Sequence, residues 1–324
     1  MSRLNRLAWV FSEVLVTFLT LKLPFKDNSG YMEPEFPSTL EGFGYRFNDR
    51  GRLRSIQTGK PFEFAVSTDA VYNQRRYEAL GQVLDQYVYD LLLKEGLEQV
   101  NIPVDHKGDA PSTFIFQSHD ALSNTQKLLI IIHGSGVVRA GQWARRLIIG
   151  DSLQRGTQIG YIRRAIALGY GVLVLNPNDN SRDGVPIRSS SSPEEHALHV
   201  WDEIVSKAVA RHVAIVAHSY GGVVTMNLLA SRPEAINRIM AIAFTDSVHF
   251  PPPASILNDV REIAKNWRIS DRPLDSLLTQ QPNDIASVSA GTTEHTLTSW
   301  MAFASVFDFL EDMYMKTIAL EGSS

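Results

Sequence analysis

The stretch Val213–Gly222 constrains the fold more than any other part of the chain. Its sequence is Val-Ala-Ile-Val-Ala-His-Ser-Tyr-Gly-Gly, and its first four residues are apolar and largely β-branched. Such a run is typical of a strand buried on both faces, and the apolar run 223–230 predicts a helix soon after it. The residues between them must form a sharp strand-to-helix turn of the kind that presents a nucleophile, the nucleophile elbow.

Ser219 stands at the apex of this predicted turn. A turn this sharp needs small residues two positions before and two after its apex, and Ala217 and Gly221 meet that requirement. The Ser219 hydroxyl is then expected over the carboxyl end of the sheet, with the Tyr220 N–H aimed at a developing oxyanion. A strand followed by an inactive glycine-rich turn gives the same match, and alanine replaces the usual glycine at 217. The pattern therefore predicts the geometry of the turn rather than activity.

The size, charge and cysteine content exclude several classes of protein. A chain of 324 residues with 44% hydrophobic and 20% charged residues predicts one large globular domain with appendages. Because cysteine is absent, disulfide frameworks and cysteine-based zinc sites are excluded. A net charge of −4 argues against a broad electrostatic footprint for nucleic acid, so no direct nucleic-acid contact is expected.

A second apolar run, Leu128–Ile132, predicts a buried strand that ends in His-Gly-Ser-Gly. A glycine-rich loop at the carboxyl end of such a strand is where an α/β-hydrolase builds the other half of its oxyanion hole. Gly134 and Ser135 are therefore the candidate donors beside Tyr220. Since the loop lacks the glycine patterns of nucleotide-binding sites, no cofactor is expected. No metal site is expected either.

Further apolar runs at 171–176 and 239–244 predict two more strands, with helices between them. Strands and helices in alternation imply an α/β fold with a mostly parallel, doubly wound sheet, here α/β-hydrolase-like. Before the sheet, the alternating residues 43–56 predict a hairpin, and residues 71–94 predict a helix, which together form an N-terminal extension. The irregular segment 251–284 is expected to serve as a cap or lid.

Ser219, Asp246 and His295 follow one another along the chain, each just past a predicted strand. A serine becomes nucleophilic when a histidine accepts its proton, and a carboxylate orients that histidine and stabilises its charged form. The predicted roles are nucleophile for Ser219, acid for Asp246 and general base for His295. Two alternatives stay open at this point, with His249 as the base and Asp284 as the acid.

The two ends of the chain differ from its centre. Residues 1–34 form an N-terminal apolar segment, residues 35–315 the predicted domain, and residues 316–324 a tail. Within residues 1–30, the run Leu7–Leu21 places apolar residues on one helical face. It predicts an amphipathic helix that docks on the core or on a membrane surface. A secretory signal is the alternative, although Glu13 interrupts the apolar run.

Five segments together carry a resemblance to a known family. They begin at Leu40 (L-E-G-F-G-Y-R-F-N-D-R-G), His133 (H-G-S-G-V-V-R-A-G-Q-W-A-R-R), Ala217 (A-H-S-Y-G-G), Thr245 (T-D-S-V-H) and Ser289 (S-A-G-T-T-E-H). This set resembles the Argonaute-binding protein two domain, and more closely the B-type branch of the animal cotranscriptional regulators that carry it. The likeness covers most of residues 35–312.

The resemblance implies an α/β-hydrolase-like fold, binding to Argonaute proteins and chromatin-associated factors, and roles in RNA-guided silencing, heterochromatin or alternative splicing. It also implies a location in the nucleus and cytoplasm, whereas a secretory signal would direct the chain to the endoplasmic reticulum. Matched residue by residue, Ser219, Asp246 and His295 are the triad equivalents. Relatives carry a lysine-rich insertion near 180–190 and a basic tail, and both features would assist nuclear import. Here the insertion is shortened and the basic tail is missing.

Two functions of different classes follow. The first is an adaptor whose hydrolase-like fold binds Argonaute or chromatin-associated partners. The second is a serine esterase or acyl hydrolase that acts on a small ester through Ser219, since the elbow, acid and base are all present in the sequence.

Overall fold

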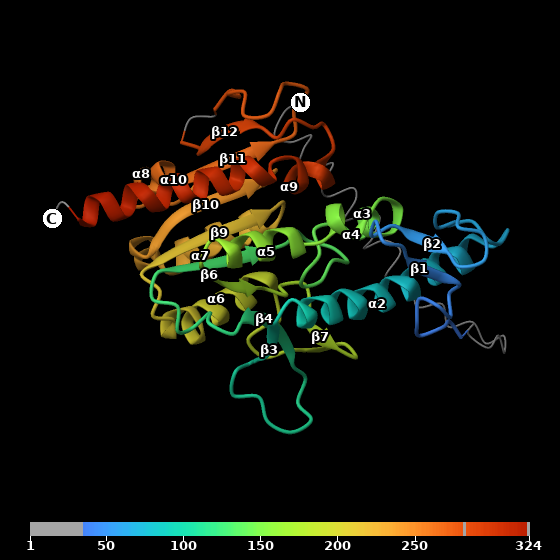
Figure 1. Cartoon of the computed structure of the whole chain (residues 1–324). Coiled ribbons are helices and arrows are strands. Elements are labelled where there is room, and N and C mark those ends of the chain that lie inside the picture. Colours follow the sequence, from blue (N-terminus) through green and yellow to red (C-terminus); the bar gives the residue numbers. More distant parts are fainter. Residues whose placement is uncertain (1–34, 281–282, 323–324) are drawn as a thin grey trace.

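The computed structural model describes residues 35–280 and 283–322 (Figure 1). The predicted N-terminal segment 1–34, with its apolar run Leu7–Leu21, lies outside the described residues. Among the residues that are described, no helix combines the length and apolarity needed to cross a membrane.

The centre of the molecule is an eight-stranded sheet. Its spatial order is β3 (Leu97–Ile102), β4 (Thr113–Ser118), β6 (Tyr170–Val174), β5 (Lys127–Ile132), β9 (His212–His218), β10 (Ile239–Thr245), β11 (Ala264–Arg268) and β12 (Ala286–Ser289). β4 runs antiparallel to both of its neighbours, and every other neighbouring pair is parallel. This order with one reversed strand is that of the α/β-hydrolase sheet, which confirms the predicted fold class.

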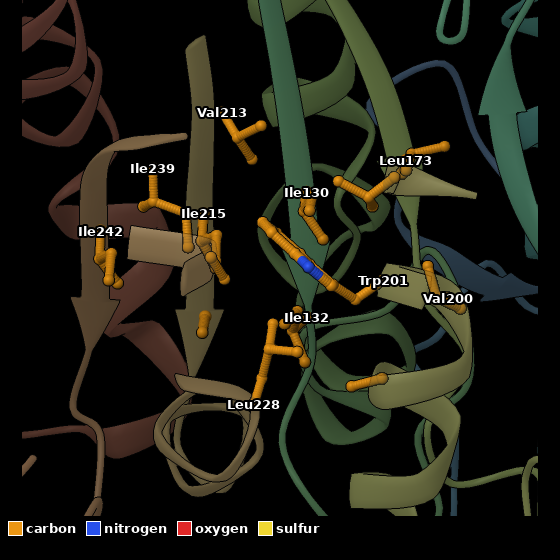
Figure 2. Packing of buried hydrophobic residues seen from close by; sticks show 14 of the residues in the cluster. Ile130, Ile132, Leu173, Val200, Trp201, Val213, Ile215, Leu228, Ile239 and Ile242 are labelled. Atoms are coloured by element: carbon orange, nitrogen blue, oxygen red, sulfur yellow. The ribbon is translucent and has the colours of Figure 1, made fainter. Parts of the chain in front are cut away.

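The central strands are buried on both faces, as their continuous apolar runs predicted. Along β5, Ile130 and Ile132 contribute to one apolar cluster, whereas Leu129 and Ile131 contribute to a second one on the opposite face. Successive side chains point to opposite faces of a strand, so an unbroken apolar run requires cover on both. In the first cluster, Trp201 lies close to β5 (Figure 2).

Helices cover each face of the sheet (Figure 1). The face with Trp201 is covered by α6 (Pro193–Glu203), α7 (Gly221–Ser231) and α8 (Leu257–Ile263). The other face is covered by α2 (Ala70–Lys94), α5 (Ile159–Ala167) and α10 (Phe303–Glu321). α10 continues six residues past Met315, where the predicted domain ends, because no helix-breaking residue precedes Gly322. Shorter helices are α3 (Arg145–Gly150), α4 (Leu153–Gly156), α9 (Thr298–Met301), and the 3₁₀ turns η1 (Val205–Lys207), η2 (Pro233–Asn237) and η3 (His295–Leu297).

The segment 251–284 is not the irregular lid that its sequence suggested. It contains α8 and then β11, which lies in the sheet between β10 and β12. The prediction was wrong because β11 lacks a continuous apolar run: Lys265 and Asn266 lie between the buried Ala264 and Trp267. The polar side chains find local partners, since Lys265 stacks over the Trp267 ring. Neighbouring strands, not local sequence, make this segment a strand.

Two hairpins stand outside the central sheet. The N-terminal one, β1 (Tyr45–Phe47) with β2 (Leu53–Ser55), is antiparallel and confirms the predicted hairpin. The second, β7 (Ser181–Arg182) with β8 (Val185–Pro186), lies where the insertion was expected to be shortened. Its turn consists of Asp183 and Gly184, both with positive φ (49° and 78°), as a tight two-residue hairpin requires.

Candidate functional site

The elbow forms where the sequence placed it, between β9 and α7. Ser219 has φ 54°, a left-handed conformation that is costly for a residue with a side chain. Hydrogen bonds hold this backbone in place: the Ser219 N–H donates to the Thr245 carbonyl (3.1 Å), and the Ser219 carbonyl accepts from the Gly222 N–H (3.1 Å). Only 6% of Ser219 is exposed. The strained apex is therefore fixed by its neighbours, as expected at a functional position.

The loop after β5 lies directly beside Ser219. A Cβ added at Gly134 would come within 3.0 Å of the Ser219 Cβ, so only glycine fits without displacement. The Gly134 carbonyl accepts hydrogen bonds from His133 Nδ1 (2.8 Å) and from Asn178 Nδ2 (2.9 Å). Since the carbonyl and N–H of a trans peptide point in opposite directions, these two donors also fix where the Ser135 N–H points.

Tyr220, the other candidate oxyanion donor, lies at the N-terminus of α7. Its backbone is helical (φ −63°, ψ −21°), so its N–H belongs to the positive end of the helix dipole. Its hydroxyl donates to Glu194 Oε1 on α6 (2.7 Å). Burial, together with this hydrogen bond to Glu194, raises the pKa of Tyr220 to about 12. The phenol is therefore neutral and anchored, while the backbone amide remains at the elbow.

The predicted acid and base are in contact. His295 Nδ1 donates to Asp246 Oδ2 at 2.7 Å, and the Ile269 N–H donates to Asp246 Oδ1 at 3.2 Å. Burial alone would raise the pKa of Asp246, but the hydrogen bond and charge of His295 outweigh it and hold that pKa below its ordinary value of 3.8. An ionised Asp246 fixes the Nδ1–H tautomer of His295, which is the arrangement a general base needs.

β11, the strand that the sequence did not reveal, joins the acid loop to the base loop. The Trp267 carbonyl accepts from the Asp246 N–H (2.8 Å), and the Arg268 carbonyl accepts from the Ala290 N–H (2.8 Å). With the Ile269 amide on Asp246, three consecutive residues at the end of this strand set the relative position of the two loops. No apolar pattern pointed to them.

Two side chains that sequence reasoning did not assign to the site also contact the His295 loop. The His218 ring lies against the His295 ring, with centroids 4.7 Å apart, and its Nδ1 donates to the Thr245 carbonyl (2.8 Å). Burial, and next the charge of His295, lower the pKa of His218 to about 3. From α3, the Arg146 guanidinium donates to Glu294 Oε2 (2.9 Å) and Thr296 Oγ1 (2.8 Å), the residues on either side of His295.

The two alternative residues pair with each other. His249 Nε2 donates to Asp284 Oδ1 (3.0 Å), and His249 Nδ1 bonds Ser247 Oγ (2.7 Å). Of the two candidate histidines, His295 is the one in contact with Asp246. The catalytic role of the set with Ser219 stays a prediction, with its geometry now described.

Two hollows in the described part of the chain lie elsewhere, and neither is lined by Ser219, Asp246 or His295. One is a cavity of about 10 Å³ beside Trp201, and the other, of about 390 Å³, lies along the N-terminal hairpin. These hollows do not identify a substrate pocket at the elbow. Across residues 35–280 and 283–322, histidines and carboxylates form no group of three suited to a metal ion.

Comparison with known proteins places this arrangement in a family. The sequence model of the Arb2 domain family matches residues 36–184 and 180–274 of this chain. The chain belongs to the Arb2 domain family. It is 43% identical over 337 residues to the Homo sapiens protein named cotranscriptional regulator ARB2A, covering 86% of this chain and 81% of that relative. The two parts of the Arb2 match meet at the β7–β8 turn, where the loop is short.

Among solved structures, this Arb2 domain has the fold of two histone deacetylase chains. One, from Saccharomyces cerevisiae, matches with a TM-score of 0.50 at 13% identity, covering 72% of this chain and 98% of that one. The other, the histone deacetylase Clr3, matches with a TM-score of 0.51 at 16% identity, covering 79% of this chain and 41% of that one. At these identities the likeness concerns the fold alone.

Proposed function

We propose that this protein is a cotranscriptional regulator that acts as an adaptor on a hydrolase-like fold. The observation that carries the proposal is the 43% identity to cotranscriptional regulator ARB2A over 86% of the chain. A likeness of this extent covers most of the chain. Function does not follow from fold alone, so the proposal rests on the sequence relationship.

The partners we propose are Argonaute proteins and chromatin-associated factors, with roles in RNA-mediated silencing, heterochromatin or alternative splicing. The net charge of −4 supports protein partners over direct contact with nucleic acid. The test is co-precipitation of Argonaute with the purified full chain, with human ARB2A as a parallel bait. Failure of this chain to retain Argonaute where ARB2A retains it contradicts the proposal.

We propose that the protein is located in both the nucleus and the cytoplasm. The tight turn at Asp183-Gly184 leaves no room for a basic import signal there, so import would depend on another segment or on a partner. Imaging of the full chain with a small C-terminal tag tests this location. Overlap with an endoplasmic reticulum marker would instead support a secretory signal within residues 1–30.

A serine hydrolase acting on a small ester is the second candidate function. Its support is the Asp246–His295 hydrogen bond of 2.7 Å together with the left-handed backbone of Ser219. In this mechanism Ser219 Oγ attacks the acyl carbon while His295 takes its proton and Asp246 stabilises the imidazolium. The tetrahedral oxyanion would be bound by backbone N–H groups of Tyr220 and of the loop at Gly134.

A fluorophosphonate probe tests this second candidate directly, because it reacts with activated serines. Wild-type labelling that is lost in Ser219→Ala and in His295→Ala, but kept in Ser247→Ala, supports a working triad. Ser247 is the matched control, since it also bonds a histidine that is paired with a carboxylate. Equal labelling of wild type and Ser219→Ala, or no labelling of a folded protein, would contradict the hydrolase function. The adaptor function would be unaffected by either result.

A further inference from the structure

The outer face of the N-terminal hairpin carries an unusual set of side chains. β1 and β2 pair Arg46 directly opposite Arg54, whereas the neighbouring pair Phe47 and Leu53 packs against α2 and α3. Alternation along the strands places Arg52 on the same outer face as Arg46 and Arg54. We call these three residues the arginine face.

The three residues of the arginine face make no ion pair in the described structure, although two of them lie directly opposite each other. Among the described residues, Arg46 and Arg52 have no carboxylate within ion-pair distance, and the Arg54 guanidinium donates to the Leu53 carbonyl instead. Seven other described arginines are paired with a carboxylate, namely Arg145, Arg146, Arg155, Arg163, Arg182, Arg188 and Arg232, whereas others such as Arg164 are not. Like charges directly opposite in a hairpin are destabilising. Folding alone therefore gives no reason for the Arg46–Arg54 pair.

A hollow lined by both polar and apolar residues continues the arginine face at one end. Beyond the pair Tyr45 and Ser55, the next residues on the outer face are Gly44 and Ile56, which are joined by the hydrogen bond from the Ile56 N–H to the Gly44 carbonyl (2.8 Å). A Cβ at Gly44 would meet nothing within 4 Å, and Ile56 is 44% exposed. Both residues line the hollow of about 390 Å³, together with Phe43, Tyr45 and the polar residues Glu41, Ser55 and Gln57.

We propose that this face binds an acidic segment of a partner protein that carries an apolar side chain. Carboxylates of the segment would pair with Arg46, Arg52 and Arg54, and its apolar side chain would enter the hollow beside Ile56. A short protein segment is favoured over nucleic acid because three arginines can pair with a few carboxylates, whereas a chain with a net charge of −4 offers no broad basic surface to a polyanion. The proposal goes beyond the function given above, since it names a surface and its ligand chemistry.

The substitution Arg46→Glu is expected to raise the stability of the protein and to weaken its binding of an acidic segment. Arg46→Glu converts the like-charge pair with Arg54 into an opposite-charge pair, so the melting temperature is expected to rise by about 1–2 °C. The same change removes a carboxylate-binding group and adds a repelling one. A merely structural role for Arg46 predicts no loss of binding.

The experiment measures fluorescence anisotropy of a labelled peptide of repeated Glu-Glu-Leu with the full chain. We expect binding that weakens with salt, as contacts between exposed charges do. Arg46→Glu should weaken it at least about tenfold, a change of about 1.4 kcal/mol. Arg164→Glu is the matched control, because Arg164 is also exposed and also lacks a carboxylate partner in the described structure, yet lies on α5.

Two further measurements test the hollow beside Ile56 and the preference for an acidic peptide separately. Ile56→Ala should weaken the Glu-Glu-Leu peptide but leave a Glu-Glu-Ser peptide unchanged, because only the first has a side chain for the hollow. Binding of the acidic peptide no tighter than a Lys-Lys-Leu peptide, or equal binding by Arg46→Glu and wild type, overturns the proposal. So does displacement of the peptide by a single-stranded oligonucleotide at lower concentration, which would make nucleic acid the occupant. None of these outcomes depends on Ser219 or on Argonaute.

Discussion

The molecule contains two sets of serine, histidine and aspartate with very different surroundings. In one, His295 contacts Asp246 beside the elbow serine; in the other, His249 bonds Ser247 and Asp284. The residue types are the same in both. The backbone around each serine is not.

Ser219 lies at the apex of a strained turn, with φ 54°, directly before the first turn of α7. Ser247 instead makes a local turn: its hydroxyl also accepts the N–H of His249, two residues away, at 3.3 Å. His249 uses both ring nitrogens within its own set. The comparison indicates that a triad is recognised by the position of its serine relative to N–H donors rather than by its residue types.

The largest expected difference between the two sets lies in their carboxylates. Asp246→Asn should slow labelling by a fluorophosphonate probe about 10⁴-fold, because the amide favours the wrong tautomer of His295. Asp284→Asn should leave the labelling rate within about threefold of wild type. The rates are followed by gel fluorescence over time. Comparable losses in both variants would remove the distinction between the sets.

Crowding the elbow should have the next largest effect. Gly134→Ala places a methyl group 3.0 Å from the Ser219 Cβ and should slow labelling about 10²-fold through misplacement of the serine. Gly150→Ala is the matched control, because a Cβ there meets nothing within 4 Å. Unchanged labelling in Gly134→Ala would show that the loop after β5 does not shape the reacting position.

Acid should destabilise the elbow side through its buried histidines. Burial lowers the pKa of His133 to about 4, and of His196 and His218 to about 3, from 6.5. Because the unfolded chain binds these protons more readily, stability is full above pH 6.5 and falls as the pH drops toward the folded pKa values. Each histidine contributes up to about 1.4 kcal/mol per pH unit in that window. Urea unfolding at several pH values should therefore show that the free energy of unfolding changes less steeply with pH in His218→Phe than in wild type. An equally steep change in both would contradict the lowered pKa of His218.

The smallest effect is expected in the set around Ser247. Ser247→Ala leaves the buried Nδ1 of His249 without its hydroxyl partner and should lower the free energy of unfolding by about 1–2 kcal/mol. The same variant should keep wild-type labelling. Thermal and urea denaturation provide the measurement. A loss of labelling with normal stability would instead assign Ser247 to the reaction.

Much of the fold and part of the site could be predicted because their signals are local. Ser219 was found from small residues around a strand-to-helix turn, and β5 and β9 from unbroken apolar runs. Gly134 followed from its place at the end of β5. β11 escaped prediction because Lys265 and Asn266 interrupt its apolar pattern, and the sheet on either side stabilises it instead.

The sequence by itself determined the elbow, the α/β alternation, and which residue types stand at the strand ends. Only the tertiary structure decided which histidine meets which carboxylate. β11, inserted between β10 and β12, binds Asp246 through Trp267 and Ile269 and aligns it with His295, while His249 turns back to Asp284. Strand-end motifs depend on a few neighbouring residues, whereas pairing between distant loops depends on the order and register of the strands that carry them.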